Sequence, residues 1–318
     1  MLDVHSEVLQ AEKRIRSSIR ETPLDYSLAI SKMTNTNVYL KCENLQFTGS
    51  FKMRGAVNTL LSLTKSQQEK GVVVASTGNH GAAVAYNLNK LSIPGIIVVP
   101  ENASSAKVDN IRQYTLSLMF HGTDSVDTEL YALDYARHHG MLYVSPYNHP
   151  QVIGGQGTVG LEILRQLNQV DVIFVAVGGG GLIAGIAGYI KKISPKTKII
   201  GCLPETSPVM FESIKAGKVI SMNTSPTISD ATAGGIEPNS ITFDLCHTYV
   251  DDFILVSERD IQLAMLVMMK TQHLLVEGAA GVALASLFKC AERFQGMNVV
   301  VVLSGSNISL DTLKHIIE

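Results

Sequence analysis

Three groups of residues in this sequence have types and spacings that could do chemistry. Four consecutive glycines, Gly178 to Gly181, follow an apolar run over residues 172–177, and a second apolar run ends in Ser76-Thr77-Gly78-Asn79-His80. Upstream of both, Ser50-Phe51-Lys52 places a lysine at the expected start of a helix. Backbone N–H groups in such turns bind phosphate, and a lysine amine can condense with a carbonyl group. Together they predict a site for a phosphorylated cofactor that is also held covalently.

The glycine run by itself supports more than one function. Glycines after a buried strand permit close backbone approach, and the helix expected from Leu182 presents unpaired N–H groups to a phosphate. However, residues 179–184 also satisfy the G-x-G-x-x-G/A dinucleotide pattern, and Glu205 lies where a ribose-binding carboxylate is expected. A nicotinamide-dependent oxidoreductase therefore remains an alternative on this stretch. A turn that merely packs a helix on a strand is a third interpretation.

Lys52 favours the covalent cofactor over the dinucleotide. Ser50 is a good N-cap, and the apolar pattern from Phe51 to Leu61 is helical, which predicts Lys52 in the first helical turn. A cation there opposes the helix dipole, and burial would lower the pKa of the amine further. Both effects favour the neutral amine, the form that attacks a carbonyl group. The alternative is a solvated surface lysine, which is where most lysines lie.

Short apolar runs alternate with helical patterns along the whole chain, which predicts parallel sheets with helices on their faces. The expected strands cover residues 37–42, 72–75, 96–99, 116–120, 141–144, 172–177, 198–203, 253–256 and 299–303. The expected helices include residues 4–20, 82–91, 125–139, 158–167, 182–193, 258–270 and 281–294. Ligands of open parallel sheets bind beyond the carboxyl ends of the strands, where these candidate turns are expected.

Composition narrows the class of protein. The 318 residues are enough for two domains, and 26 basic against 28 acidic residues leave no basic surface for nucleic acid. The four cysteines have no paired spacing, so neither a zinc site nor a disulfide framework is indicated. The uncharged stretch 172–190 contains the glycine run and is a poor membrane span. The N-terminus lacks the pattern of a secretory signal, and we expect a cytoplasmic enzyme with no membrane partner.

Five motifs resemble one family, and they occur in the family's order over about residues 4–310. They are Ser50-Phe51-Lys52-x-Arg54-Gly55-Ala56, Ser76-x-Gly78-Asn79-His80-Gly81, Gly155-Gln156-Gly157-Thr158, the glycine run and Ser304-Gly305-Ser306-Asn307. The sequence resembles the threonine/serine dehydratases and serine racemases, which are fold type II pyridoxal-phosphate enzymes. The resemblance implies a tryptophan-synthase-β-like α/β fold with two open parallel-sheet domains, the cofactor in the cleft between them, and a homodimer. A large cofactor-binding domain would comprise residues 1–48 and 146–318, and a small domain residues 49–145.

The resemblance also implies a role for each motif residue. Lys52 would form the Schiff base with pyridoxal 5'-phosphate, and the substrate carboxylate would be held by the loop of Ser76, Thr77, Gly78, Asn79 and His80. The remaining cofactor contacts would be Phe51 against the ring, Asn79 on the ring hydroxyl, Gly178, Gly179, Gly180, Gly181 and Leu182 on the phosphate, and Ser304 at the pyridine nitrogen. A hydroxyl at that nitrogen makes the ring a weaker electron sink than a carboxylate would, which suits β-elimination.

The implied activity is an ammonia-lyase that converts L-threonine, L-serine or a similar β-hydroxy amino acid to a 2-oxo acid and ammonia. Racemisation is an alternative, because Thr77 keeps a hydroxyl where racemases carry a serine that acts on the opposite face. Dehydration of 3-hydroxyaspartate or of an ectoine-derived amino acid is another alternative.

Other positions depart from the family pattern or have open roles. The carboxylates of a divalent-cation site in relatives align with Leu203 and Val209, so no metal site is expected. Glu277 matches an acidic residue near the cofactor, although a carboxylate that favours a helix dipole is an equal interpretation. Tyr147 could face the substrate or simply pack.

Overall fold

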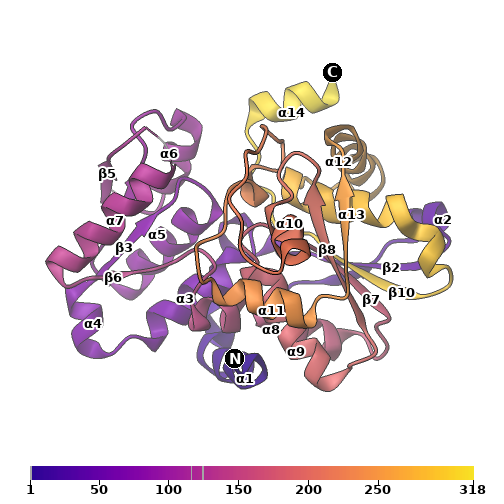
Figure 1. The fold of residues 1–318 in the computed structure, drawn as a ribbon, viewed down its shortest axis with the longest axis horizontal. Coiled ribbons are helices and arrows are strands. Elements are labelled where there is room, and N and C mark those ends of the chain that lie inside the picture. Colours follow the sequence, from indigo (N-terminus) through magenta and orange to yellow (C-terminus); the bar gives the residue numbers. More distant parts are fainter. Residues whose placement is uncertain (1, 116, 124) are drawn as a thin grey trace.

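Two β-sheets organise the chain, and each carries helices on its faces (Figure 1). The computed structural model describes residues 2–115, 117–123 and 125–318. In the six-stranded sheet the order is β1-β2-β10-β7-β8-β9, with β1 (Leu24–Tyr26), β2 (Asn37–Lys41), β7 (Val172–Ala176), β8 (Lys198–Pro204), β9 (Asp252–Val256) and β10 (Asn298–Val302). In the four-stranded sheet the order is β5-β4-β3-β6, with β3 (Val72–Ala75), β4 (Gly95–Val99), β5 (Leu118–Phe120) and β6 (Leu142–Tyr143).

All strand pairs are parallel except β1 with β2, which confirms the predicted fold class of two parallel-sheet α/β units. β1 is absent from the strands predicted above because it has three residues and no apolar run. The other predicted strands occur with ends that differ by at most two residues. Leu116, where one of them was expected to begin, lies outside the described residues.

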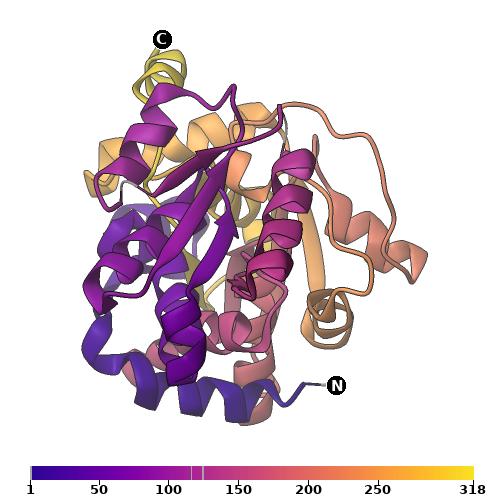
Figure 2. The ribbon, with the colours of Figure 1, turned by 90° about the vertical axis from the view of Figure 1, so that its left-hand side faces the viewer.

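The α-helices are α1 (Val4–Ile15), α2 (Leu28–Thr34), α3 (Lys52–Ser62), α4 (Lys65–Lys70), α5 (Asn79–Leu91), α6 (Ser105–Arg112), α7 (Ser125–His139), α8 (Pro150–Gln166), α9 (Gly181–Ile193), α10 (Val209–Ala216), α11 (Ile241–Tyr249), α12 (Glu258–Gln272), α13 (Gly278–Cys290) and α14 (Leu310–Ile317). Short 3-10 helices are η1 (Arg16–Ser18), η2 (Glu43–Leu45), η3 (Phe47–Gly49), η4 (Asp230–Thr232) and η5 (Ala291–Phe294). Figure 2 turns the four-stranded unit toward the viewer, with α1 at the bottom and the C-terminal helix at the top.

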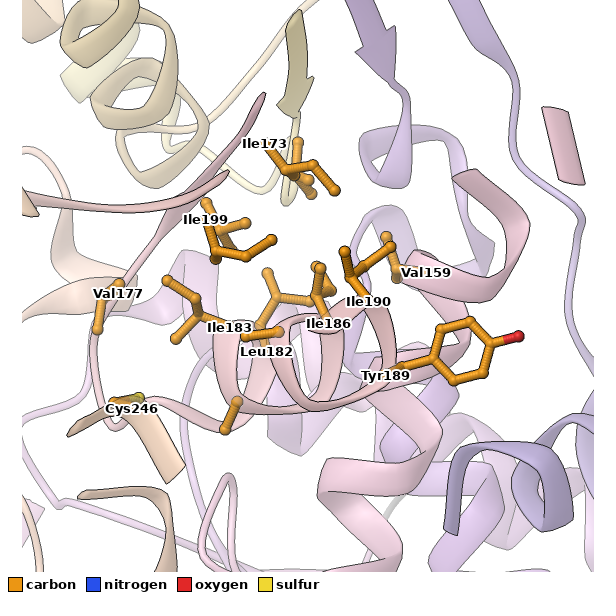
Figure 3. Packing of buried hydrophobic residues seen from close by; sticks show 14 of the residues in the cluster. Val159, Ile173, Val177, Leu182, Ile183, Ile186, Tyr189, Ile190, Ile199 and Cys246 are labelled. Atoms are coloured by element: carbon orange, nitrogen blue, oxygen red, sulfur yellow. The ribbon is translucent and has the colours of Figure 1, made fainter. Parts of the chain in front are cut away.

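Alternate residues of the central strands serve two cores, one on each face of the six-stranded sheet. Ile173 points to the core formed with α8 and α9, whereas Phe174 points to the core formed with α12 and α13. Figure 3 shows the first core, where Ile173 and Ile199 of the sheet meet Ile183 and Ile186 of α9. Because both faces of the strands are covered, these strands are almost continuously apolar, as parallel sheets require.

Helix α8 crosses α3 and α9 at very short distance, which gives the Gly155-Gln156-Gly157 motif a packing role. A Cβ at Gly155 would lie 2.6 Å from the carbonyl oxygen of Arg54, and one at Gly185 would lie 2.4 Å from that of Ile153. The sequence predicted a helix near residues 158–167, but α8 already begins at Pro150. Its glycines weaken the helical pattern in the sequence, and they are needed because the neighbouring helices pack too closely for larger side chains. In this way α8 fixes the position of α3 against the six-stranded unit.

The uncharged stretch 172–190 forms strand β7, a turn and most of α9. Within the described part of the chain, no helix combines the length and the apolarity that a bilayer crossing needs.

Candidate active site

Helix α3 begins at Lys52, so the lysine does lie in the first turn, but the predicted cap is wrong. The residue before the helix is Phe51, and no side chain caps the helix. Ser50 is extended and forms an antiparallel bridge with Gly305, which holds it away from the capping position. Its hydroxyl is buried and has no hydrogen-bond partner among the described residues.

The amine of Lys52 lies at a cavity and has one hydrogen-bond partner among the described residues. Its Nζ donates a hydrogen bond of 2.8 Å to the carbonyl oxygen of Pro146. Part of the side chain is exposed to the cavity, but the surrounding protein removes most water from the amine. This desolvation lowers the pKa of Lys52 to about 8, and the negative charge of Glu277 opposes the shift only in part. The amine therefore has a substantial neutral fraction near neutral pH.

Ser304, which follows strand β10, lies beside the start of α3. Its carbonyl oxygen accepts a hydrogen bond of 3.1 Å from the N–H of Phe51, so the backbone ties the two segments together. The hydroxyl of Ser304 is buried and without a partner among the described residues. An unsatisfied buried hydroxyl costs free energy, which is consistent with a group kept for a ligand.

A cluster of buried charged side chains holds the start of α3 in place. Arg54 is fully buried, and its guanidinium donates to both carboxylate oxygens of Glu43 and both of Glu162. Lys41 adds a contact of 2.6 Å to Glu162. The positive charges of Arg54 and Lys41 lower the pKa of the Glu162 carboxyl to about 2, against the opposing effect of burial. The cluster joins the first turns of α3 to β2 and α8 of the six-stranded unit.

A second polar network joins Asn79 to Glu277 and Asn307. The amide nitrogen of Asn79 donates to both oxygens of Glu277, at 3.0 and 2.9 Å, and its amide oxygen accepts a bond of 2.6 Å from Asn307. Burial raises the pKa of Glu277 to about 7, although the bonds from Asn79 and from the N–H of Asn307 oppose the shift. Asn79 is thus held rigidly, at the start of α5, by two residues of the six-stranded unit that lie outside its strands.

Six of the predicted site residues line one cavity of about 970 Å³ between the two units. They are Lys52, Ser76, Thr77, Gly78, Asn79 and His80. His80 has its Nε2 atom 3.0 Å from the carbonyl oxygen of Val144, and burial lowers its pKa to about 3. The imidazole is therefore neutral. Phe51, Ser304 and the glycine turn with Leu182 are not part of the cavity lining.

The glycine turn is closed on one side by Tyr147. A Cβ at Gly179 would lie 2.5 Å from the Tyr147 ring, and the hydroxyl of this tyrosine accepts a hydrogen bond of 2.9 Å from the N–H of Glu237. Gly180 has φ +86°, a conformation that favours glycine. None of the hydrogen bonds between described residues uses the N–H of residues 178, 179 or 180 as its donor. Tyr147 therefore packs against the turn, and the turn keeps free N–H groups.

Glu205, considered above as a ribose ligand, and Leu203, which aligns with a metal-binding carboxylate of relatives, make ordinary structural contacts. Glu205 pairs with Lys289 at 3.1 Å, on an exposed face, and Leu203 is buried in the sheet. Within the described residues, no group of three or more His, Cys, Asp or Glu side chains is placed to hold a metal ion.

Two sheets with an amine nucleophile at the cleft between them define an α/β enzyme of fold type II. The family described as pyridoxal-phosphate dependent enzyme matches residues 15–305, and the chain belongs to this family. Its sequence is 39% identical to the catabolic L-threonine dehydratase of Staphylococcus aureus, over 98% of this chain and 91% of that protein. It is 36% identical to the L-threonine ammonia-lyase of Thermotoga maritima, over 98% of this chain and 77% of that protein. The solved structure of maize serine racemase has a TM-score of 0.92 and 31% identity, over 98% of this chain and 96% of that one.

Three observations test whether the residues fit pyridoxal phosphate. They are the desolvated amine of Lys52, the buried hydroxyl of Ser304 without a partner, and the free N–H groups of the glycine turn. All three fit an aldehyde cofactor with a ring nitrogen and a phosphate. The family membership removes the nicotinamide alternative.

The sequence alone missed two participants. The carbonyl group of Pro146 contacts the amine of Lys52, and no side-chain pattern marks a carbonyl group. Asn307 completes the network around Asn79, and its place in the Ser304-Gly305-Ser306-Asn307 motif was a signal that could have indicated it.

Proposed function

We propose that this chain is a pyridoxal-phosphate dependent ammonia-lyase that acts on L-threonine, L-serine or a similar β-hydroxy amino acid and releases a 2-oxo acid and ammonia. The observation that carries the proposal is the desolvated amine of Lys52, which lines the cavity and has its pKa lowered to about 8. Curated relatives named threonine dehydratase or ammonia-lyase, at 36–39% identity, support the same reaction.

When bound, pyridoxal phosphate supplies an aldehyde for amine exchange and a ring that stabilises negative charge at the substrate Cα. Lys52 would hold the cofactor before substrate arrives and, once released, would remove the proton from Cα as a general base. A base is most effective when its pKa lies near the working pH, and the desolvation of Lys52 brings its pKa to that range.

Substrate orientation would come from the start of α5. Ser76, Thr77 and Gly78 follow strand β3 and line the cavity where the N–H groups of a helix start favour an anion. The substrate carboxylate would lie there, and Asn79 and His80 at the same helix start would complete the loop. The neutral imidazole of His80 adds no competing charge.

Cofactor contacts would follow the same geometry. Ser304 would offer its hydroxyl to the pyridine nitrogen, and Phe51 would lie against the ring. The N–H groups of Gly178 to Gly181 and Leu182 would bind the phosphate at the start of α9. The ring of Tyr147, which packs against Gly179, would form one wall of that phosphate site.

A substrate panel tests the reaction. Purified protein loaded with pyridoxal phosphate is incubated with L-threonine, L-serine, 3-hydroxyaspartate and an ectoine-derived amino acid, and 2-oxo acid and ammonia are measured together. Equal amounts of both from threonine or serine support the proposal. Absence of 2-oxo acid from every member contradicts it.

Racemisation is the second candidate, because Thr77 brings a hydroxyl to the cavity lining. Chiral analysis of the recovered serine separates the two reactions. If Thr77 protonates the opposite face, the T77A variant loses D-serine formation and keeps 2-oxo acid release. Inversion that is unchanged in T77A would remove this residue from a racemase mechanism.

We also propose a cytoplasmic homodimer with a large cofactor-binding domain of residues 1–48 and 146–318 and a small domain of residues 49–145. The grouping of β3 to β6 within 72–143 supports this division. Size-exclusion chromatography with light scattering tests the dimer.

A further inference from the structure

Asn307 lies on the segment that follows strand β10, at the wall of the same cavity as Lys52 and Asn79. The nitrogen of its side-chain amide donates two hydrogen bonds, one of 2.8 Å to the carbonyl oxygen of Thr48 and one of 2.6 Å to Oδ1 of Asn79. An amide nitrogen carries two N–H groups, so both are used. The function proposed above gives this side chain no role.

The carbonyl group of Thr48 fixes which way the Asn307 amide faces. A backbone carbonyl oxygen can only accept a hydrogen bond, so the amide must present its nitrogen, and not its oxygen, to that group. The backbone of Asn307 is held as well, because its N–H donates to Oε2 of Glu277 at 3.2 Å. Asn307 therefore meets Asn79 with a donor.

This donor determines the orientation of the Asn79 amide. Its oxygen faces Asn307, so its nitrogen faces the carboxylate of Glu277, with distances of 3.0 and 2.9 Å to the two oxygens. The oxygens of one carboxylate lie close together as seen from the nitrogen, so a single N–H group serves both. Among the described residues, no hydrogen bond uses the second N–H group of this amide. That group remains available to a ligand in the cavity that Asn79 lines.

The network around Asn79 lies close to the nucleophile. Burial has the largest effect on both pKa values, lowering that of Lys52 and raising that of Glu277, and the charge of each group opposes the shift of the other. Such mutual influence requires that the two groups lie near each other. The free N–H group of Asn79, which is bonded to Glu277, therefore belongs to the reaction centre and not to a remote wall of the cavity.

We propose that Asn307 is the positioning residue that sets the amide orientation of Asn79, so that Asn79 presents an N–H donor, and not an oxygen, to the ring hydroxyl of bound pyridoxal phosphate. The proposal rests on the proposed function only in its cofactor and in the place expected for Asn79. The two ends of an amide have nearly the same size and shape, so packing does not choose between them. Hydrogen-bond partners have to make the choice.

A purely structural role is the competing explanation, because Asn307 also ties its segment to that of Thr48. Ser306 makes a tie of the same kind, since its hydroxyl donates to the carbonyl oxygen of Asn44 at 3.2 Å. Among the described residues, Ser306 has no hydrogen bond to Asn79. The orientation of Asn79 matters only to a cofactor that has the ring hydroxyl. A loosened segment, in contrast, weakens the binding of a cofactor with or without that hydroxyl alike.

The experiment titrates cofactor-free wild type, N307D and S306A with pyridoxal 5'-phosphate and with 3-deoxypyridoxal 5'-phosphate, which lacks the ring hydroxyl. Fluorescence measures both dissociation constants. Aspartate has nearly the shape of asparagine but only acceptor oxygens, so the Asn79 amide of N307D is expected to turn its nitrogen toward position 307. We expect wild type and S306A to bind the natural cofactor about 2- to 10-fold more tightly than the analogue, as one hydrogen bond predicts, and N307D to lose this preference. The negative charge added in N307D affects both cofactors and cancels in the ratio.

A second measurement uses Glu277. In N307D the turned oxygen of Asn79 would face the Glu277 carboxylate, and two acceptors cannot bond, so the urea midpoint of the cofactor-free protein is expected to fall. E277Q offers an N–H donor to the turned oxygen. The double variant N307D/E277Q is therefore expected to have a higher midpoint than N307D, while the preference for the ring hydroxyl stays lost. If N307D does not fold, the double variant provides the same cofactor comparison.

Retention of the wild-type preference in N307D, or in the double variant, would overturn the proposal. Loss of the preference in S306A, or its absence from wild type, would overturn it as well, and a double variant no more stable than N307D would contradict the turned amide. These measurements contain no substrate. Failure of the proposed lyase function is therefore distinguishable, because it appears as absence of 2-oxo acid from every member of the substrate panel.

Discussion

The amine of Lys52 donates a hydrogen bond of 2.8 Å to the carbonyl oxygen of Pro146, and the ring of the next residue, Tyr147, covers Gly179. Two consecutive residues therefore connect the nucleophile with the glycine turn. A carbonyl oxygen accepts a hydrogen bond from either protonation state of an amine, so this contact does not force the ammonium form. The contact instead fixes the direction of the amine, and desolvation determines its charge.

Replacement of the lysine is the first test. K52A is expected to lower 2-oxo acid release by about 10⁴-fold or more, because both the covalent attachment and the base are lost. Borohydride treatment followed by peptide mass spectrometry measures the attachment directly. We expect a pyridoxyl adduct on Lys52 in the wild type and none in K52A. K196A, a change at an exposed lysine, is the control, and an adduct on any other lysine would contradict the assignment.

Removal of the Ser304 hydroxyl is expected to weaken cofactor binding without lowering the stability of the cofactor-free protein. Because this buried hydroxyl has no partner among the described residues, S304A is expected to leave the stability of the cofactor-free protein unchanged or slightly higher. Loss of one hydrogen bond is expected to weaken pyridoxal phosphate binding by about 2- to 10-fold. Fluorescence titration measures the dissociation constant. S286A, at another buried serine, is the control and is expected to bind as wild type.

The contact between Gly179 and Tyr147 predicts a loss of stability on adding one carbon. A Cβ at Gly179 would lie 2.5 Å from the ring, so G179A is expected to lower the free energy of unfolding by about 1–3 kcal/mol. Urea denaturation measures the change. G235A meets nothing within 4 Å and is expected to stay within about 0.5 kcal/mol of wild type. If the ring causes the clash, G179A costs less in a Y147A background.

Glu277 predicts a dependence of stability on pH. Its pKa is raised from 4.5 to about 7, so the folded protein keeps a proton that the unfolded chain releases between those values. The contribution of Glu277 to the free energy of unfolding therefore falls as pH rises from about 5 to 7, by about 3 kcal/mol at most. Lys52, whose pKa is lowered, acts in the opposite direction and only above about pH 8.

The E277Q variant lacks this titration, and its free energy of unfolding is expected to fall less than that of wild type over the same interval. Urea denaturation of both proteins without cofactor, at pH 5, 6 and 7, measures the difference. Parallel pH profiles would contradict a raised pKa at Glu277. Groups other than Glu277 titrate in both proteins and cancel in the comparison.

Much of the fold could be predicted because the strands are buried on both faces. The apolar runs at β3, β7 and β10 stand out in the sequence, and the turns that follow them hold the predicted site residues other than Phe51 and Lys52. Strand β1 and the short helices such as α4 and α10 could not be predicted from periodicity, because they bury too few residues to impose a pattern. Their positions depend on tertiary contacts.

The residue types of the site could be predicted from the sequence, but many of the contacts between these residues could not. Lys52, Asn79 and the glycine turn were visible as motifs, but the capping role expected for Ser50 was wrong because a bridge to Gly305 competes for its backbone. The partners of Asn79 are distant in sequence, since Glu277 lies 198 positions away.

The ion cluster around Arg54 has a consequence for motion. It fastens the base of α3 to the six-stranded unit, as does the bond between Phe51 and Ser304, whereas the loop from Ser76 to Gly78 belongs to the four-stranded unit. Asn79, which directly follows this loop, is in turn bonded to Glu277 of the six-stranded unit, so the nucleophile and the start of α5 are anchored to the same unit. An arriving amino acid would therefore meet a reaction centre that is already assembled on both sides.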